Sequence, residues 1–262
     1  MPELKVGEEN YQIDGLLLDK DGTLLDFMSL WGSWSHKIIE RFTAVLEQRG
    51  LIVPFPSAPA LWGLIQNESG QATDYDRNGP LAMGTLDDLL ALLASQGYRQ
   101  GLSWAEAREL AYDCRLSADE MLEQERPLTA IPGVVDFLEQ CRKLHIPLAV
   151  VTADETEAAE RHLEWLGVRD YFTVVLGTDK AARGKPFPDL ALMACSQLGI
   201  DPSRVAVIGD TNGDMIMAKA AGALAAIGLD TTKTDTAVRC NFADADVIVR
   251  SYNELELAGV GQ

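Results

Sequence analysis

Short apolar runs alternate with amphipathic helical patterns along the second half of the chain, and this alternation constrains the fold more than any other feature. Strands are expected at 148–151, 174–176, 205–208, 224–227 and 247–249, and helices at 134–144, 156–166, 189–198 and 214–221. Continuous apolar strands separated by helices predict a parallel sheet that is covered by helices on both faces. An earlier apolar run at 13–18 fits a buried strand of the same sheet.

Between that first strand and the alternating half, the residues show helical patterns and no convincing strand. Apolar residues step by three and four from Trp31 to Val45, which predicts a helix that stops near Gly50. A short helical piece is expected at 61–65, after three prolines (Pro54, Pro56 and Pro59). The apolar spacing from Leu86 to Leu93 predicts a helix that ends at Gly97. Ser103 and Glu106 form a capping box, which predicts the start of a helix that stops at Pro127. We therefore predict a doubly wound α/β core built from 1–26 and 128–262, with an all-helical domain, 27–127, inserted after the first strand.

The composition and charge of the chain limit the classes of molecule that it is expected to bind. With 47% hydrophobic and 24% charged residues, the 262-residue chain reads as an ordinary globular protein. Its net charge of -18 repels nucleic acid and anionic membranes. Cys114, Cys141, Cys195 and Cys240 lie far apart and are expected to be buried thiols in a reducing compartment. Neither a signal peptide nor a membrane-spanning apolar run is recognisable, so a cytoplasmic location is expected.

Polar residues that could take part in catalysis or ligand binding follow the ends of several predicted strands. They are Asp19, Asp21 and Gly22 after the first strand, Thr152 after the second, Lys185 in a Gly-Lys-Pro-Phe-Pro loop, and Asp210 and Asp214 after a later strand. In an open doubly wound sheet, ligands bind beyond the carboxyl ends of the strands. These residues are therefore expected at one edge of one sheet.

Asp19 and Asp21 are the most informative of them. Side chains two apart on a strand share a face, and Gly22 lets the backbone turn away, so both acids crowd one small volume. Such crowding is unfavourable unless a divalent cation neutralises it or the two acids divide the roles of nucleophile and proton carrier.

The pattern Asp19-Lys20-Asp21-Gly22-Thr23-Leu24, followed in order by Thr152, Lys185 and Gly209-Asp210 with Asp214, resembles the four motifs of the haloacid dehalogenase superfamily of aspartate-based phosphotransferases. The insertion at 27–127 resembles the helical cap of the phosphoglycolate phosphatase and β-phosphoglucomutase branch. The resemblance implies that Asp19 attacks phosphorus to form an aspartyl-phosphate. It also implies that Asp21 protonates the leaving oxygen and later deprotonates the hydrolytic water.

The resemblance further implies a Mg²⁺ ion held by Asp19, Asp210 and the backbone carbonyl of Asp21, with Asp214 acting through water or by orienting its neighbours. Thr152, Lys185 and the loop at Gly22 would bind the phosphate. Lys185 is favoured over Lys180 and Arg183 of the same loop by its Lys-Pro-x-Pro setting. The implied substrate is a small phosphorylated metabolite, phosphoglycolate or a sugar phosphate, bound by a monomer or homodimer.

Three positions depart from the common family pattern. Lys20 stands where an apolar or aromatic residue is usual, Ala153-Asp154 stands where a small residue and Asn are frequent, and Gly213 precedes Asp214. None of these departures removes a catalytic group. Lys20 has no explanation at the level of sequence.

Several alternatives stay open. A β-phosphoglucomutase-like phosphotransferase keeps the same motifs, whereas a dehalogenase lacks an acid at the position of Asp21. A receiver-like protein phosphorylated on aspartate, or a non-catalytic binding protein on the same scaffold, is the alternative from another class. His36, His145 and His162 are isolated and expected in the core or at the surface, and Asp244 and Asp246 are expected in solvent. In the insertion, Trp31 and Trp34 are expected to pack internally, and Arg77 is a candidate for a substrate contact.

Overall fold

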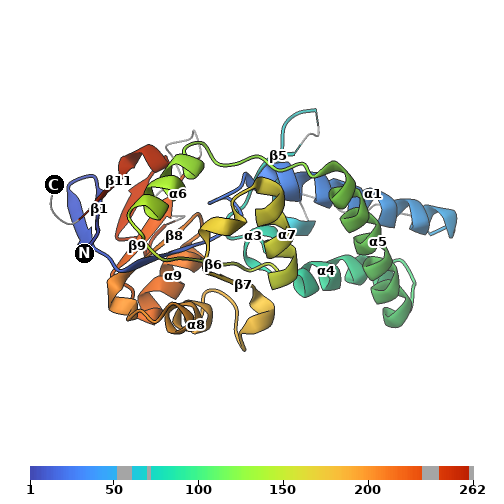
Figure 1. The fold of residues 1–262 in the computed structure, drawn as a ribbon. Helices are drawn as coiled ribbons and strands as arrows, with labels where there is room; N and C mark the ends of the chain where they lie inside the picture. Colours follow the sequence, from blue (N-terminus) through green and yellow to red (C-terminus); the bar gives the residue numbers. More distant parts are fainter. Residues whose placement is uncertain (52–60, 70–71, 232–241, 260–262) are drawn as a thin grey trace. The chain divides into compact units, whose positions relative to one another are not determined.

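The computed structural model describes residues 1–51, 61–69, 72–231 and 242–259. The chain divides into two compact units, one formed by Met1–Asp26 with Leu128–Gln262 and the other by Phe27–Pro127. The first unit contains the candidate catalytic and metal-binding residues and a six-stranded sheet (Figure 1).

The six strands of this sheet are β3 (Gly15–Leu18), β6 (Leu148–Val151), β7 (Val174–Leu176), β8 (Val205–Gly209), β9 (Ala225–Leu229) and β10 (Val247–Val249). Their order is β10-β9-β8-β3-β6-β7, and every described pairing is parallel. The chain builds outward from β3 through β6 to β7, then returns to the other side of β3 with β8. The predicted parallel sheet is confirmed, and its strand order reverses beside β3, where ligands bind in such folds.

Helices cover both faces of the sheet. Helices α6 (Val134–Lys143) and α7 (Thr156–Leu166) pack on one face, and α8 (Asp189–Leu198) and α9 (Asn212–Ala221) pack on the other (Figure 1). Within β3, Leu16 and Leu18 join the core on the α6 and α7 face, whereas Leu17 joins the core on the α8 and α9 face. Because side chains alternate along a strand, burial on both faces requires the continuous apolar runs seen in the sequence.

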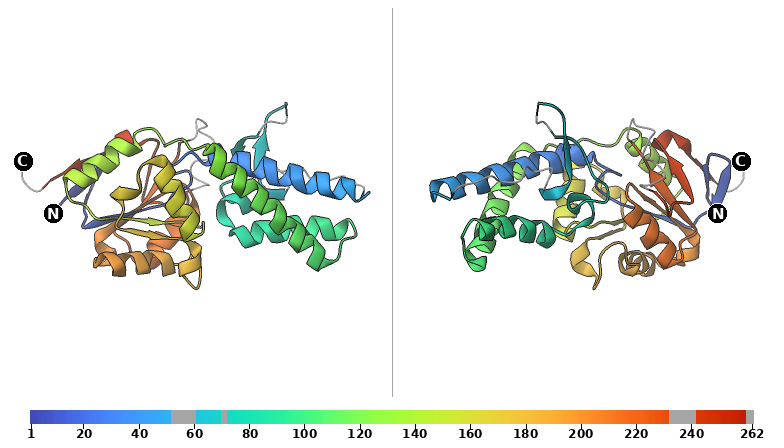
Figure 2. Two further views of the ribbon diagram at one scale, coloured as in Figure 1. Left: turned by 45° about the vertical axis from the view of Figure 1, so that its right-hand side comes forward. Right: turned by 180° about the vertical axis from the view of Figure 1, so that it is seen from behind.

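A second, antiparallel sheet in this unit was not predicted. It consists of β1 (Glu3–Val6), β2 (Glu9–Gln12) and β11 (Leu255–Ala258) in the order β11-β1-β2. The pairing of β1 with β11 brings the two ends of the described chain side by side (Figure 2). Short 3₁₀ turns occur at Arg169–Tyr171, Thr178–Lys180, Pro202–Arg204 and Tyr252–Glu254.

The second unit is built mainly from helices. A π-helical turn, Met28–Gly32, leads into α1 (Ser33–Gln48), and α3 (Pro80–Met83), α4 (Leu86–Arg99) and α5 (Trp104–Glu125) follow. Helices α1, α4 and α5 lie side by side (Figure 2). The predicted capping box of Ser103 and Glu106 is present at the start of α5.

The expectation of an all-helical insertion was wrong at one place. Strands β4 (Leu64–Gln66) and β5 (Ala72–Tyr75) pair antiparallel, so the helical piece expected at 61–65 continues only to Trp62. The two buried residues of this pair, Leu64 and Tyr75, lie opposite each other, and so short a pair has no periodicity to detect. The prolines at 54, 56 and 59 lie outside the described residues.

Helix α4 does not end at Gly97 as expected. A Cβ atom at Gly97 would lie 3.1 Å from the ring of Phe42 and 3.2 Å from the Cβ of Ala107. The glycine therefore allows close packing of α4 against its neighbours inside the helix, and the helix continues to Arg99.

Cys114, Cys141 and Cys195 are buried free thiols, as predicted, and Cys240 lies outside the described residues. Burial raises the pKa of Cys114 and of Cys195 to about 11, so both stay protonated and unreactive near neutral pH. Among the described helices, none combines the length and apolar character that a membrane span requires.

Candidate active site

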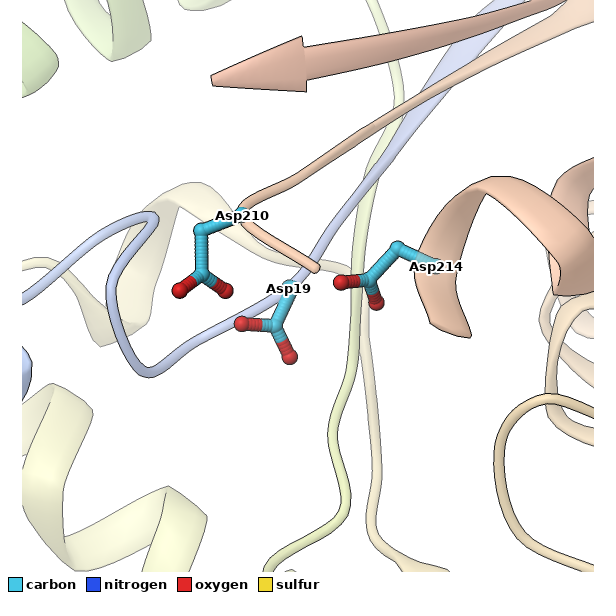
Figure 3. A group of neighbouring side chains, drawn as sticks. All are labelled: Asp19, Asp210 and Asp214. Atoms are coloured by element: carbon cyan, nitrogen blue, oxygen red, sulfur yellow. The ribbon is translucent and has the colours of Figure 1, made fainter. Parts of the chain in front are cut away.

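Three buried aspartates meet beyond the carboxyl ends of β3 and β8. The Asp19 amide donates to the Ile208 carbonyl at 2.9 Å, which fixes the exit of β3 beside β8. Asp210 follows β8 directly, and Asp214 lies in the first turn of α9. Each residue offers a carboxylate oxygen, and these oxygens all lie within 4.8 Å of one another (Figure 3). The predicted convergence of these acids is present.

Asp214 is fixed by the start of α9. Thr211 is the N-cap residue, and its amide and hydroxyl donate to Asp214 Oδ2 at 3.1 and 2.6 Å in a reciprocal capping box. A Cβ at Gly209 would lie 2.4 Å from the Asp214 Cβ, so the strand end needs glycine for this close approach. One Asp214 oxygen is thus used by the helix cap, which suits the orienting role expected of this residue.

Lys185 joins the three acids. Its buried Nζ contacts Asp19 Oδ1 and lies 2.5 Å from Asp214 Oδ1. The two other cations of the loop pair elsewhere, Lys180 with Asp179 at 3.1 Å and Arg183 with Asp189 at 2.8 Å. Among these three described cations, Lys185 is the one that reaches Asp19.

Thr152 follows β6, the strand that neighbours β3. Leu18 lies opposite Val150 in this pairing, so Asp19 and Thr152 leave the sheet at the same edge. The Asp154 amide donates to Thr152 Oγ1 at 3.1 Å. Because this oxygen accepts a hydrogen bond, its own proton can point elsewhere and donate to a phosphate oxygen.

The loop after Asp19 folds back on itself. Gly22 has a φ of 80°, a conformation that glycine adopts without strain, and its amide donates to the Leu25 carbonyl at 2.8 Å. This amide is therefore used within the loop, and a role for Gly22 in phosphate binding stays a prediction. The Asp21 carboxylate is not part of the three-acid group. It accepts from Lys20 Nζ at 2.8 Å.

Electrostatics at the three acids favour a bound cation. Burial raises the pKa of Asp19 from 3.8 to about 7. The positive charge of Lys185 offsets this rise only in part, and the negative charges of Asp214 and Asp21 add to it. Burial lowers the pKa of Lys185, but the carboxylates of Asp19 and Asp214 outweigh burial and raise this pKa above its ordinary value. Lys185 is therefore an ammonium. The three carboxylates and the Lys185 ammonium lie together in one buried group. The residues thus fit a divalent cation that prefers hard oxygen ligands.

Sequence reasoning missed the contacts of Lys20. This side chain is fully buried and lies 3.1 Å from both Asp154 Oδ2 and His162 Nδ1. A signal was available, because the two departures from the family pattern at 20 and 154 carry opposite charges. No local pattern connects them to His162, which belongs to α7.

The remaining candidates lie elsewhere. His36 and His145 are exposed, and Trp34 is buried as expected. Arg77 of the second unit pairs with Asp74 at 3.1 Å and stacks 4.3 Å from the centre of the Tyr75 ring. Asp246 is exposed, as expected, and it also accepts from the Ala226 amide at 2.8 Å. Asp244 was expected in solvent but is only partly exposed, because it accepts a hydrogen bond at 2.9 Å from the side chain of Asn212 at the start of α9.

Comparison with known proteins gives a family match. Residues 13–222 match the family model described as haloacid dehalogenase-like hydrolase. The probable phosphatase IndB of Dickeya dadantii is 38% identical over 136 residues, 52% of this chain and 58% of that protein. The validoxylamine A 7'-phosphate phosphatase of Streptomyces hygroscopicus is 31% identical over 154 residues, 55% of this chain and 70% of that protein. The first of these matches spans less than two thirds of the relative's length.

A solved structure shares the fold. The crystal structure of a predicted phosphoglycolate phosphatase from Haemophilus somnus superposes with a TM-score of 0.68 and 21% identity. The superposition covers 92% of this chain and 95% of that chain. The fold similarity thus extends over both units, as does the match to the family model.

Proposed function

The chain belongs to the haloacid dehalogenase-like hydrolases, and from this premise we propose that it is a Mg²⁺-dependent phosphatase that hydrolyses a small phosphorylated metabolite. The observation that carries the proposal is the convergence of Asp19, Asp210 and Asp214 with Lys185 at the switch point of the sheet. Relatives that bear the name phosphatase support the same reaction class.

In the first step, an Asp19 carboxylate oxygen attacks the phosphorus atom. The bond between phosphorus and the ester oxygen breaks, and Asp21 donates a proton to that leaving oxygen. Lys185, held between Asp19 and Asp214, supplies fixed positive charge beside the transferring phosphoryl group. The Thr152 hydroxyl supplies a hydrogen bond to a phosphoryl oxygen.

In the second step, a water molecule attacks the phosphorus of the aspartyl-phosphate. The Asp21 carboxylate takes a proton from this water, and the bond between phosphorus and the Asp19 oxygen breaks. Asp19 is regenerated as a carboxylate, and inorganic phosphate leaves. Asp21 thus returns to its protonated form, ready for the next substrate.

Asp19, Asp210 and the backbone carbonyl of Asp21 would hold Mg²⁺, with Asp214 acting through water. A bound ion would supply the positive charge that lets an anionic carboxylate approach an anionic phosphate. The carboxylate oxygens of Asp19, Asp210 and Asp214, all within 4.8 Å of one another, support this assignment.

The substrate class follows from the family and the insertion. We propose that 27–127 acts as a cap that selects the substrate, because it is inserted directly after the loop that carries Asp19 and Asp21. Phosphoglycolate and sugar phosphates are the first compounds to try.

The test is release of inorganic phosphate from p-nitrophenyl phosphate and from a panel of phosphorylated metabolites, with Mg²⁺ and with EDTA. We expect Mg²⁺-dependent release and a preference in kcat/KM for one metabolite. Absence of metal-dependent release from every ester would refute the proposal. Isomerisation of a sugar phosphate without net phosphate release would instead identify a mutase.

A further inference from the structure

Lys20 is the centre of a polar group of which the proposed reaction uses only Asp21. Its side chain has no solvent exposure, and its Nζ lies 2.8 Å from Asp21 Oδ1, 3.1 Å from Asp154 Oδ2 and 3.1 Å from His162 Nδ1. The contact with Asp21 is a hydrogen bond and an ion pair, the contact with Asp154 is an ion pair, and His162 lies within hydrogen-bond distance. We call Lys20, Asp21, Asp154 and His162 the Lys20 network.

The protonation of this network follows from its charges. Burial lowers the pKa of Lys20, but the carboxylates of Asp21 and Asp154 outweigh burial and raise it above the ordinary value, so Lys20 is an ammonium. His162 Nδ1 lies 3.1 Å from Lys20 Nζ and 3.4 Å from Asp154 Oδ2, so the imidazole contacts both members of the buried ion pair. Removal of one partner from this buried ion pair would leave an uncompensated charge in the core, which is costly.

The network is anchored to three separate parts of the fold. Lys20 and Asp21 follow β3, Asp154 follows β6, and His162 projects from α7. Asp154 is itself fixed, because its Oδ1 accepts from the Glu155 amide at 2.8 Å and its own amide donates to Thr152 Oγ1. The network therefore holds the loop of Asp21 rigidly against the rest of the core.

We propose that Lys20 is a positioning residue that holds the Asp21 carboxyl group where it can donate a proton to the leaving oxygen. The inference rests on the proposed function, because it assigns Lys20 a part in the proton transfer of that reaction. Lys20 acts through Oδ1 of Asp21, which leaves Oδ2 to exchange the proton. Asp154 and His162 stabilise the buried charge and fix its place.

A positioning role has a signature that a purely structural role lacks. An alkyl phosphate has a poor leaving group that needs a proton from Asp21, whereas the p-nitrophenolate of p-nitrophenyl phosphate leaves without one. The value of kcat/KM reports the steps through cleavage of the ester bond. Misplacement of Asp21 should therefore lower kcat/KM for the alkyl ester much more than for the aryl ester.

The experiment compares wild type with Lys20→Met/Asp154→Asn. The double variant removes the buried ion pair as a unit, so no carboxylate is left without its cation at position 154. Lys20→Met alone strands Asp154 and should lower Tm by about 10 °C, most of which Asp154→Asn should restore. A control, Arg169→Met/Glu160→Gln, removes another ion pair of the same unit whose residues lie outside the candidate site.

We expect kcat/KM of the double variant to fall about a hundredfold for the alkyl ester and less than about threefold for p-nitrophenyl phosphate. The control should change both esters equally. An unchanged ratio between the two esters, whether both rates fall or neither does, would overturn the positioning role. No turnover of either ester by wild type would instead count against the proposed function.

A second variant keeps the test decisive if the first does not fold. Lys20→Gln/Asp154→Asn retains an N–H donor toward Asp21 on a side chain one bond shorter, without a buried charge. Partial recovery of alkyl ester hydrolysis relative to Lys20→Met/Asp154→Asn supports positioning by a hydrogen bond. If only the Gln variant folds, its kcat/KM for the alkyl ester should still fall more than that for p-nitrophenyl phosphate, because the shorter side chain restores the contact only in part. An unchanged ratio would then overturn the positioning role.

Discussion

At the scale of single residues, Asp19 combines the most demanding set of contacts. It is buried, touches Lys185 and shares its surroundings with Asp210 and Asp214. Replacement by Asn keeps the shape but provides no oxygen that can form an acyl-phosphate. We expect Asp19→Asn to lower kcat at least about a thousandfold, measured as phosphate release at saturating substrate. Circular dichroism should show a folded protein, and activity equal to wild type would refute the nucleophile assignment.

Asp21 should have a different phenotype, because it handles protons and forms no covalent bond. Asp21→Asn removes the acid of the first step and the base of the second, and we expect kcat to fall about 10²- to 10⁴-fold. Acid quenching with radiolabelled phosphate donor should trap more aspartyl-phosphate per enzyme than in wild type, since hydrolysis loses its base. Loss of labelling without any loss of rate would contradict this division of roles.

Which of these residues could be predicted depends on how local their signals are. Asp19, Asp210 and Asp214 are recognisable because each stands at a fixed distance from the end of an apolar strand, and parallel strands bring their ends together. Lys20 meets His162 across 142 positions, and no spacing rule connects a loop residue to one face of a distant helix. The imidazole was therefore expected to be an isolated core or surface residue.

At the scale of elements, the start of α9 ties helix capping to the site. The Thr211 hydroxyl accepts from the Asp214 amide and donates to its carboxylate, and the other Asp214 oxygen faces Lys185. We expect Thr211→Ala to cost about 1 kcal/mol of stability and also to lower kcat/KM, because Asp214 loses a bond that orients it. Urea unfolding and steady-state kinetics measure the two effects.

Helix α4 offers a matched control. Thr85 and Asp88 form the same Thr-x-x-Asp capping box in the second unit. Thr85→Ala should cost a similar free energy of unfolding but leave kcat/KM unchanged. Equal losses of kcat/KM in both variants would show that the Thr211 effect comes from general destabilisation.

Whether a strand could be predicted from the sequence depends on how deeply it is buried. Strands buried on both faces, such as β6 and β8, are continuous apolar runs that need no partner to be recognised. Strand β2 has no buried residue among Glu9–Gln12, and β1 buries only Leu4 and Val6. These strands form because β1 pairs with β11 and β2, a contact between the chain ends that sequence spacing cannot reveal.

At the scale of the whole molecule, the acid group should make stability depend on pH in the absence of metal. Burial raises the pKa of Asp19 from 3.8 to about 7, so the folded state binds this proton more tightly than the unfolded state. A raised pKa gives stability that is full below about pH 4 and is lost as pH rises toward 7. In EDTA, Tm should therefore fall by several degrees between pH 5 and pH 8, corresponding to at most about 3 kcal/mol.

Mg²⁺ should reverse this dependence, because a cation at Asp19 and Asp210 favours the ionised carboxylates that burial penalises. We expect the rise in Tm on adding Mg²⁺ to be larger at pH 8 than at pH 5, where protons compete with the ion for Asp19. Asp19→Asn tests the origin of both effects, since it removes the titrating group. In EDTA this variant should lose most of the fall in Tm between pH 5 and pH 8 and should be more stable than wild type at pH 8. If Tm in EDTA falls with pH in Asp19→Asn as much as in wild type, the pH dependence comes from other groups. The buried charge of Asp19 would then have no measurable cost in stability.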